Sequence, residues 1–345
     1  MAPSTSLNRT AQGEHSHGAC RVVIADPDID PDTARRILDP LSVKVAFERR
    51  DWAGQDIVGV VTNSESPIQL ADLVRCPDLK VAITTTTGLD HIDVAACRQR
   101  GVRVWHPADY CSDEVADTAI ALLLGLLRGT ILLNRDVLAG NWHFTSAGPL
   151  QRSDTTRLGI LGFGTIGRKV ASRAQALGMH VAAHDPGVEP NAFATAGVEQ
   201  AGLESLFRIS TAISIHAPLT DDTRGLVSER LLALLPAGSV LVNLARGEIL
   251  DTAALLTRLD GGGLAAAALD VLAVEPPTEQ APAPRHPRLV VTPHAAWYSE
   301  QSARTVLVRP LEVMRDCLLG TAPPRSDRLS IAGNLADLLA SANAR

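Results

Sequence analysis

The sequence predicts an α/β protein with two doubly wound parallel sheets. Short apolar runs rich in β-branched residues alternate with helical patterns along nearly the whole chain of 345 residues, as is typical of strands buried on both faces. The runs fall into two series, each long enough for a domain of ordinary size. The glycine-rich segment LGFGTIG, after the first run of the second series, is the third observation, because such segments join a strand to a helix in doubly wound sheets.

The first series contains five apolar runs that we expect to form strands: RVVIAD (21–26), VKVAF (43–47), IVGVVT (57–62), LKVAITT (79–85) and VRVWH (102–106). The second series contains six: TRLGIL (156–161), HVAAHD (180–185), AISIHA (212–217), SVLVNLA (239–245), AAAALDV (265–271) and LVVT (289–292). Between them, apolar residues recur at helical spacing from Val115 to Leu127, after the N-cap residue Ser112. We expect this helix to connect the domains. A further helix is expected at LEVMRDCLLG, ending at Gly320.

The position of this last helix, after the second series, predicts that the chain returns to its first domain. We place the two crossings near Tyr110 and Tyr298. The expected organisation is a flexible N-terminal tail (1–20), a discontinuous first domain (21–110 and 299–345) and a second domain between its two parts (111–298).

Composition excludes several classes of partner. The formal net charge of −6 comes from interspersed Asp, Glu and Arg, so no basic face can follow a phosphate backbone, and we expect no direct nucleic-acid binding. The longest apolar stretch (119–127) ends at Arg128, far short of the roughly 20 residues that a membrane span needs. Residues 1–19 lack the apolar core of a signal peptide, and we expect no ligand role for His15 and His17.

The cysteines point to a reducing compartment. The five of them show neither a CxxC pair nor the spacing of zinc ligands, and their odd number argues against a disulfide framework. We therefore expect reduced thiols, a cytoplasmic location and no bound metal.

The segment LGFGTIG carries three glycines in GxGxxG spacing: Gly162, Gly164 and Gly167. The pattern alone is weak, but here a strand precedes it, a helical run follows, and a second strand ends at Asp185. In such a Rossmann unit the first glycine permits a tight turn, the second lets the backbone approach a pyrophosphate, and the third lets helix meet strand. The amides of Thr165 and Ile166 would then face the diphosphate.

Asp185 predicts NAD rather than NADP. A carboxylate there would accept hydrogen bonds from both ribose hydroxyls and would repel a 2′-phosphate. Arg168, next to the last glycine, leaves an NADP-linked reductase open, although it lies in the first helical turn rather than after Asp185. A glycine turn that binds no ligand is the other alternative.

Chemically active side chains stand just past three later strands of the second series. Arg246 follows SVLVNLA, Asp270 and Glu275 lie at and after the end of AAAALDV, and His294 follows LVVT. Because ligands in a doubly wound sheet bind outside the carboxyl ends of the strands, we expect these side chains to face one cleft.

Arg246, Glu275 and His294 suit the reduction of a carbonyl or the oxidation of an alcohol. Arginine offers a planar fork of donors to a carboxylate or carbonyl, and histidine can protonate a carbonyl oxygen as a hydride arrives. A glutamate in contact with the imidazole would fix its tautomer and favour its protonated form, and a nicotinamide would supply the hydride. Singly, each has a structural alternative: a surface ion pair, a loop acid and a core histidine.

From about residue 21 to 320 the sequence resembles the D-isomer-specific 2-hydroxyacid dehydrogenases, on LGFGTIG, NLARGEI, ALDVLAVEP and TPHAAWYSEQ in this order. TPHAAWYSEQ and EVADTA (114–119) look most like the C-terminal binding protein branch of that family. The resemblance implies an NAD-binding Rossmann domain inserted in a flavodoxin-like substrate domain that both chain ends form. It also implies a homodimer built largely on the cofactor domain.

The resemblance also implies roles for single residues. Arg246 would bind the carboxylate and carbonyl of the substrate, and Glu275 would orient His294, the acid/base beside the cofactor. Asp270 would contact the nicotinamide amide, and Pro218 would shape the loop over the cofactor. The glutamate separates this chain from the formate dehydrogenases, which carry glutamine there, so a proton moves in this chemistry.

The loop TTTTGLDHID resembles the family segment whose backbone amides hold the substrate carboxylate, with Thr86, Thr87 and Gly88 closest. Where related sequences often carry arginine this chain has Thr84, and the lysine that phosphite dehydrogenases carry nearby is also missing. A second anionic group on the substrate therefore has no evident partner. By resemblance Trp297 would line the substrate side chain, which suggests an apolar or thioether tail. Strand propensity for the threonines and a core or interface role for the tryptophan are the alternatives.

The sequence thus predicts an NAD-dependent oxidoreductase that interconverts a small 2-oxo acid and a D-2-hydroxy acid and acts as a cytoplasmic homodimer. The alternative is an NAD(H)-responsive binding protein with little turnover. The branch that the chain resembles includes transcriptional corepressors, and these keep the same three catalytic side chains.

Overall fold

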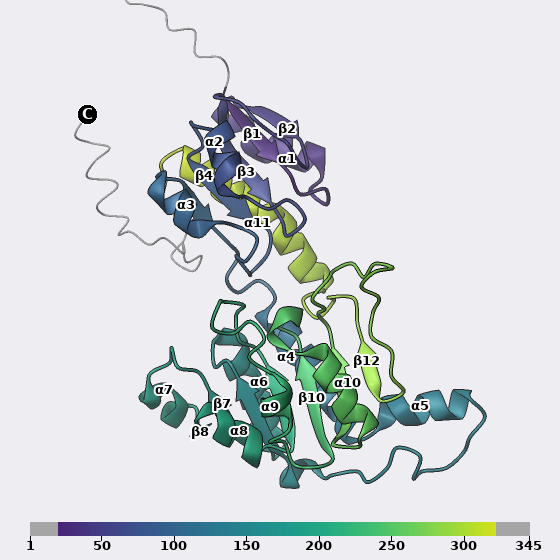
Figure 1. The fold of residues 1–345 in the computed structure, drawn as a ribbon. Coiled ribbons are helices and arrows are strands. Elements are labelled where there is room, and N and C mark those ends of the chain that lie inside the picture. Colours follow the sequence, from purple (N-terminus) through teal and green to yellow (C-terminus); the bar gives the residue numbers. More distant parts are fainter. Residues whose placement is uncertain (1–19, 322–345) are drawn as a thin grey trace, which may run out of the picture. The chain divides into compact units, whose positions relative to one another are not determined.

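The computed structural model describes residues 20–321, which separate into two compact units (Figure 1). One unit holds the described residues up to Ala108 and those from Val306 onward, and the other is Asp109–Thr305. The second division falls within helix α11 (Glu300–Leu318), a few residues after the crossing expected at Tyr298. Residues 1–19 of the expected tail, with His15 and His17, lie outside the described residues.

The first unit is built on a five-stranded parallel sheet in the order β2-β1-β3-β4-β5, the strand order of flavodoxin-like folds. Its strands are β1 (Arg21–Ile24), β2 (Lys44–Phe47), β3 (Ile57–Thr62), β4 (Val81–Thr84) and β5 (Arg103–Trp105). Its helices besides α11 are α1 (Pro31–Leu38), η1 (Asp39–Leu41), α2 (Leu70–Arg75) and α3 (Val94–Gln99).

Both faces of this sheet are covered, because successive side chains of a strand point to opposite sides. Val23 of β1 belongs to a buried cluster with α2 and α3. Its neighbours Val22 and Ile24 belong to a second cluster with α1 and the C-terminal part of α11. Burial on both faces explains why the first series consists of continuous apolar runs rather than alternating ones.

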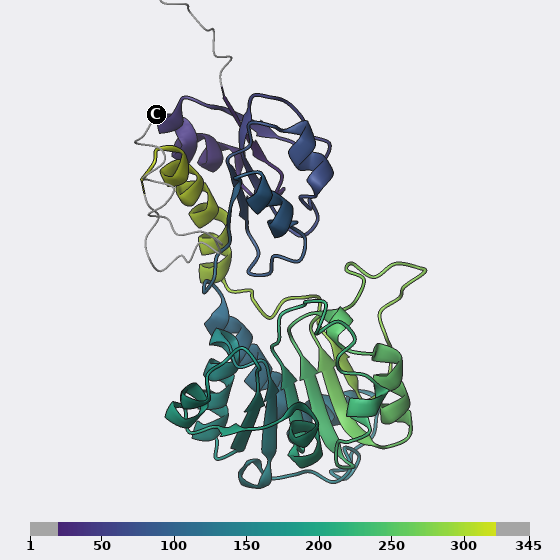
Figure 2. The same cartoon turned by 60° about the vertical axis from the view of Figure 1, so that its left-hand side comes forward.

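The second unit is built on a twisted sheet with helices packed beside it (Figure 2). The sheet is parallel and seven-stranded, in the order β12-β11-β10-β9-β6-β7-β8. Its strands are β6 (Arg157–Leu161), β7 (His180–His184), β8 (Glu199–Gln200), β9 (Ala212–Ile215), β10 (Ser239–Asn243), β11 (Leu264–Leu269) and β12 (Leu289–Val291). Starting from β6, this is the Rossmann order with one strand added at the β12 edge. The predicted fold class is confirmed. The sequence missed β8, because two polar, exposed edge residues carry no apolar signal.

Helices cover both faces of the second sheet as well. They are α4 (Ser112–Leu127), α5 (Thr130–Leu138), η2 (Ser153–Thr155), α6 (Thr165–Ala176), α7 (Pro190–Thr195), α8 (Leu203–Ile209), α9 (Glu229–Leu232), η3 (Gly247–Ile249) and α10 (Thr252–Asp260). α4 and α6 share one buried cluster, and α8, α9 and α10 share the other.

Helix α4 was expected to connect the domains, but it belongs wholly to the second unit. Its apolar residues are buried in that unit's core, and its first turns form ion pairs with α6. Asp113 lies 2.7 Å from both Lys169 and Arg173, and Asp117 lies 2.7 Å from Arg173. No single described helix is long and apolar enough to cross a membrane, and α4 and α5 pass that test only as a pair bent by 62°.

Candidate active site

The glycine loop between β6 and α6 has the shape of a dinucleotide cradle. A Cβ on Gly162, whose φ is +93°, would lie 2.5 Å from the backbone nitrogen of Ala217, and one on Gly167 would lie 2.2 Å from the carbonyl oxygen of Gly162. These two positions therefore require glycine for the fold itself. A Cβ on Gly164 would meet no described atom within 4 Å. The space beside Gly164 is thus open at the N-terminus of α6, as the approach of a diphosphate needs.

Asp185, directly after β7, is tied to this loop. Its Oδ2 accepts a hydrogen bond from the amide of Phe163 at 2.8 Å, and its Oδ1 accepts one from the amide of Gly187 at 2.9 Å. Each carboxylate oxygen has further lone pairs that can accept from ribose hydroxyls. Arg168 lies back over the loop, because its Nε donates to the carbonyl of Phe163 at 3.0 Å and its guanidinium lies 5.5 Å from that ring's centroid.

His294 and Glu275 form a hydrogen-bonded pair. Nδ1 of His294 lies 2.6 Å from Oε2 of Glu275, and the amide of Leu272 donates to Oε1 at 2.6 Å. Burial alone would raise the pKa of Glu275, but the bond to His294, the Leu272 amide and the charge of Arg246 outweigh it, and the pKa lies below its usual value. An ionised carboxylate therefore faces Nδ1, so Nε2 is the ring nitrogen left for a reacting group.

Arg246 follows β10 and belongs to the same group of side chains. Asn243 Nδ2 donates to its carbonyl at 3.0 Å, and its own Nη1 donates to the carbonyl of Ala245 at 2.8 Å. Its positive charge contributes to lowering the pKa of Glu275. The structure thus brings His294 and Glu275, which follow β12 and β11, into hydrogen-bond contact, and Arg246, which follows β10, lies close enough for its charge to lower the pKa of Glu275.

Tyr110 is a residue of this neighbourhood that sequence reasoning used only as a domain boundary. Its ring centroid lies 6.1 Å from that of Trp297. Burial raises the pKa of its hydroxyl, and the charge of Arg246 partly opposes that shift. Trp297 is partly buried, and the ring of the exposed Tyr298 meets it edge-on at 5.7 Å. A tyrosine just before a helix carries no sequence signal that would have marked it.

Gly247, which sequence reasoning also missed, allows two loops of the site to pack closely against each other. A Cβ at this position would lie 2.0 Å from the carbonyl carbon of Leu272 and 2.2 Å from the nitrogen of Ala273. Only glycine therefore lets the segment after Arg246 pass against the segment that leads to Glu275. The sequence signal that could have indicated this close approach is a glycine next to Arg246, directly after a predicted strand.

Asp270 and Pro218, both expected near the cofactor, differ in their surroundings. The Asp270 carboxylate is 1% exposed and accepts hydrogen bonds from Thr292 Oγ1 and from the amides of Ala295 and Ala296, so it anchors the segment that carries His294. Pro218 lies exposed in the loop after β9, where its carbonyl accepts a hydrogen bond from Thr223 Oγ1 at 2.6 Å.

The threonine loop of the first unit is held by its own hydroxyl groups. Thr84 is fully buried, and its Oγ1 lies 3.0 Å from Nε2 of His91 and 2.9 Å from Oγ1 of Thr86. The amide of Thr86 donates to Thr84 Oγ1 at 3.1 Å, so this amide is already used, contrary to its expected part in binding a carboxylate. Within residues 20–321 the amides of Thr87 and Gly88 donate no hydrogen bond that would compete with a ligand.

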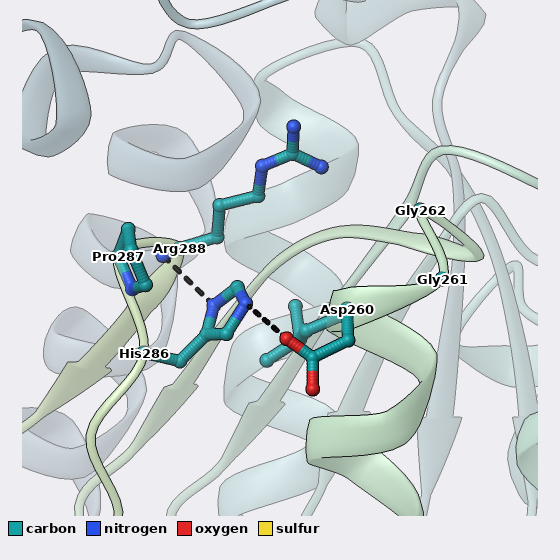
Figure 3. Close-up of a pocket in the computed structure, with 7 residues that line it drawn as sticks. Asp260, Gly261, Gly262, His286, Pro287 and Arg288 are labelled. Atoms are coloured by element: carbon teal, nitrogen blue, oxygen red, sulfur yellow. Dashed lines mark hydrogen bonds and ion pairs between the residues drawn. The ribbon is translucent and has the colours of Figure 1, made fainter.

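A hollow of about 500 Å³ lies near the amino ends of β11 and β12, away from the carboxyl ends that carry the candidate site (Figure 3). It is lined by Leu259, Asp260, Gly261, Gly262, His286, Pro287 and Arg288, at the end of α10 and just before β11 and β12. Nε2 of His286 lies 3.3 Å from Oδ1 of Asp260 across it. Because the glycine loop and the Arg–Glu–His group follow the carboxyl ends of the strands, this hollow is not part of their site. Across the described part of the chain, no cluster of three or more His, Cys, Asp or Glu could hold a metal.

Comparison with known proteins gives one consistent family. The family model "D-isomer specific 2-hydroxyacid dehydrogenase, NAD binding domain" matches residues 120–296. A glycerate dehydrogenase of Methylorubrum extorquens is 32% identical over 267 residues, which cover 73% of this chain and 82% of that protein. An (S)-sulfolactate dehydrogenase of Chromohalobacter salexigens is 36% identical over 251 residues, which cover 72% of this chain and 81% of that protein.

Among solved structures, the D-lactate dehydrogenase of Aquifex aeolicus, complexed with NAD and lactic acid, matches with a TM-score of 0.78. The match covers 87% of this chain and 96% of that chain. At 24% identity this likeness shows the fold alone.

A Rossmann unit with an Arg–Glu–His group after three neighbouring strands defines a nicotinamide-dependent oxidoreductase. The chain belongs to the D-isomer specific 2-hydroxyacid dehydrogenase family. It is an NAD-dependent 2-hydroxyacid dehydrogenase, because the family model that matches its second unit is the NAD-binding domain of that family, and the family and cofactor expected from the sequence are confirmed.

Two glycine substitutions should show which glycine is needed for stability and which for cofactor binding. Gly167→Ala should lower the free energy of unfolding by about 1–3 kcal/mol, because its methyl group meets backbone. Gly164→Ala should leave thermal stability close to that of the wild type but weaken NADH binding by about tenfold or more, because its methyl group occupies open space that the diphosphate needs. Calorimetry and NADH fluorescence titration measure both; equal NADH affinity in Gly164→Ala and the wild type would contradict the cradle.

Proposed function

We propose that this chain interconverts a 2-oxo acid and a D-2-hydroxy acid, with His294 as the acid/base, Glu275 as its orienting carboxylate and Arg246 as the anchor of the substrate. The observation that carries the proposal is the 2.6 Å bond between Nδ1 of His294 and Glu275, beside the charge of Arg246. This bond fixes which ring nitrogen faces the substrate.

In the direction of reduction, Nε2–H of His294 donates its proton to the carbonyl oxygen of the substrate. The imidazole that remains keeps its Nδ1–H on Glu275, and in the reverse direction Nε2 takes the hydroxyl proton. Arg246 binds the carboxylate and the carbonyl oxygen with its planar fork of donors, which orients the carbon that reacts. Bound NADH supplies the hydride.

For the cofactor, we propose the loop Gly162–Gly167, including the amides of Thr165 and Ile166, as the diphosphate site. Asp185 is proposed to accept from the ribose hydroxyls, since its position on the glycine loop is already fixed by the Phe163 amide. Asp270 is proposed to contact the nicotinamide amide, and Pro218 is proposed to shape the loop over the cofactor. Oδ2 of Asp270 accepts a single protein hydrogen bond, from Ala296, and so has a lone pair for the nicotinamide amide.

We propose a substrate with a single anionic group. The loop TTTTGLDHID contains no lysine or arginine, and the Thr84 hydroxyl is committed to His91 and Thr86. Thr85 Oγ1 donates to the buried carboxyl group of Asp26 at 2.5 Å, so this hydroxyl is also committed. The amides of Thr87 and Gly88 are proposed as neutral donors to the substrate carboxylate. Trp297 would line an apolar or thioether side chain.

The charge of the substrate can be tested directly. With NADH, kcat/KM should be at least about tenfold higher for 2-oxo acids with an uncharged side chain than for sulfopyruvate or phosphohydroxypyruvate, because a second anion finds no cation in the loop. Initial rates of NADH oxidation over such a panel measure this. Higher kcat/KM for the dianionic substrates would contradict the proposal.

The acid/base pair can be tested by two substitutions. His294→Asn should lower kcat by about 10² to 10⁴, because no other group donates the proton. Glu275→Gln should lower kcat by about tenfold or more, because the imidazole loses the ionic partner that orients it. The lowered pKa of Glu275 keeps that partner ionised in mildly acidic solution, so the acidic side of the wild-type profile should stay flat there.

His286→Asn is the matched control for His294→Asn, because His286 lies near the amino ends of β11 and β12, away from the candidate site. Its kcat should equal that of the wild type.

A wild-type protein that binds NADH but oxidises none of it with any 2-oxo acid would instead favour an NAD(H)-responsive, corepressor-like binding protein. That second candidate rests on the resemblance of EVADTA and TPHAAWYSEQ to the C-terminal binding protein branch.

We also propose that the chain is a homodimer and acts in the cytoplasm. Large apolar side chains stand exposed at the end of α5 and after it: Leu138 is 79% exposed, Trp142 86% and Phe144 81%. Such a group on the second unit suits a protein partner, and a second copy agrees with the dimer expected from the family resemblance. The five cysteines are free thiols, which suits a reducing compartment.

Replacing Trp142 and Phe144 together by glutamate should convert the dimer to a monomer, because two charges would have to be buried at the interface. Sedimentation equilibrium measures the change. Val74→Glu is the control, since Val74 is 59% exposed on α2 of the first unit and should leave the mass unchanged. A monomeric wild type would contradict the proposal.

A further inference from the structure

We propose that Thr292 positions the catalytic imidazole, acting through the buried carboxylate of Asp270. The inference rests on the proposed role of His294 as the acid/base. It concerns a hydroxyl group that need not touch substrate or cofactor, and it makes Thr292 a positioning residue rather than a catalytic one.

His294 has a backbone conformation that needs support. Its φ is +52°, in the left-handed region that residues with a Cβ rarely adopt. Strained conformations of this kind persist only where the surroundings hold them. Here the amide of His294 donates to the carbonyl of Asp270 at 2.8 Å and to that of Thr292 at 3.0 Å.

The carboxylate of Asp270 holds the residues on both sides of His294. Oδ1 accepts from Thr292 Oγ1 at 2.5 Å and from the amide of Ala295 at 2.9 Å, and Oδ2 accepts from the amide of Ala296 at 2.9 Å. Asp270 is 1% exposed, so water cannot replace a donor that is lost. The Thr292 hydroxyl is the one side-chain donor of the three, and it precedes His294 while the two amides follow it.

The direction of the imidazole depends on this support. Glu275, in the loop after β11, accepts a hydrogen bond from the amide of Leu272 at 2.6 Å. His294 lies in the loop after β12, and its Nδ1 must reach Glu275 Oε2 at 2.6 Å. Since a shift of about 1 Å in a catalytic group can lower turnover roughly 10²-fold, a small rotation of the turn is enough to uncouple the pair.

The test compares Thr292→Val, which keeps the β-branched shape and loses the hydroxyl, with Thr292→Ser, which keeps the hydroxyl. Thr292→Val should lower kcat by about 10- to 100-fold, with NADH affinity within about twofold of the wild type. Thr292→Ser should recover most of the turnover. Thr292→Ala also removes the hydroxyl and gives the same comparison should the valine variant not fold.

A double-mutant cycle separates positioning from a general loss of packing. If Thr292 acts through the His294–Glu275 pair, adding Glu275→Gln to Thr292→Val should lower kcat further by far less than Glu275→Gln lowers it in the wild type. Independent, multiplying effects would overturn the proposal, as would a Thr292→Val variant with wild-type kcat or a serine variant as impaired as the valine one.

Proton NMR can detect the hydrogen bond between His294 and Glu275 without any measurement of turnover. The Nδ1–H of His294, assigned by its loss in His294→Asn, should resonate far downfield in the wild type and in Thr292→Ser and should be shifted or lost in Thr292→Val. A wild type without turnover would contradict the proposed function, and this resonance would still decide the role of Thr292. An unchanged resonance in Thr292→Val would overturn it.

Discussion

The hydrogen bond between Nδ1 of His294 and Glu275 is the interaction on which the proposed chemistry of this protein depends. It joins two segments that are held independently, one by the amide of Leu272 and the other by the buried Asp270. Gly247 makes the third constraint, because only a residue without a side chain lets the Arg246 segment pass against Leu272. Besides the bond between His294 and Glu275, each of the residues His294, Glu275 and Arg246 also has a hydrogen bond to a backbone group.

The parallel sheet of the second unit explains why these segments meet. β10, β11 and β12 are neighbours in the sheet, so the residues that follow them emerge at one edge. The glycine loop follows β6 and Asp185 follows β7, at the same carboxyl edge in the other half of the sheet. Strand order therefore puts the proposed cofactor site and the proposed acid/base pair at the same end of one sheet.

The threonine loop of the first unit is the other proposed part of the site. The loop satisfies its own hydroxyl groups and one of its amides through Thr84, Thr86 and His91. The loop therefore offers neutral donors, above the buried carboxyl group of Asp26.

By itself the sequence determined the apolar strands, the glycine loop, the family and the candidate trio, because period, spacing and residue type are local properties. It placed α4 between the domains and missed β8, since neither packing partners nor a two-residue edge strand can be inferred from local pattern. Only the tertiary structure decided that Gly247 passes against Leu272, that Asp270 holds the turn of His294 and that the Thr86 amide is already occupied. The first two join segments from different strands, and the third depends on how a single loop folds back on itself, so none of them has a signature in the order of the residues.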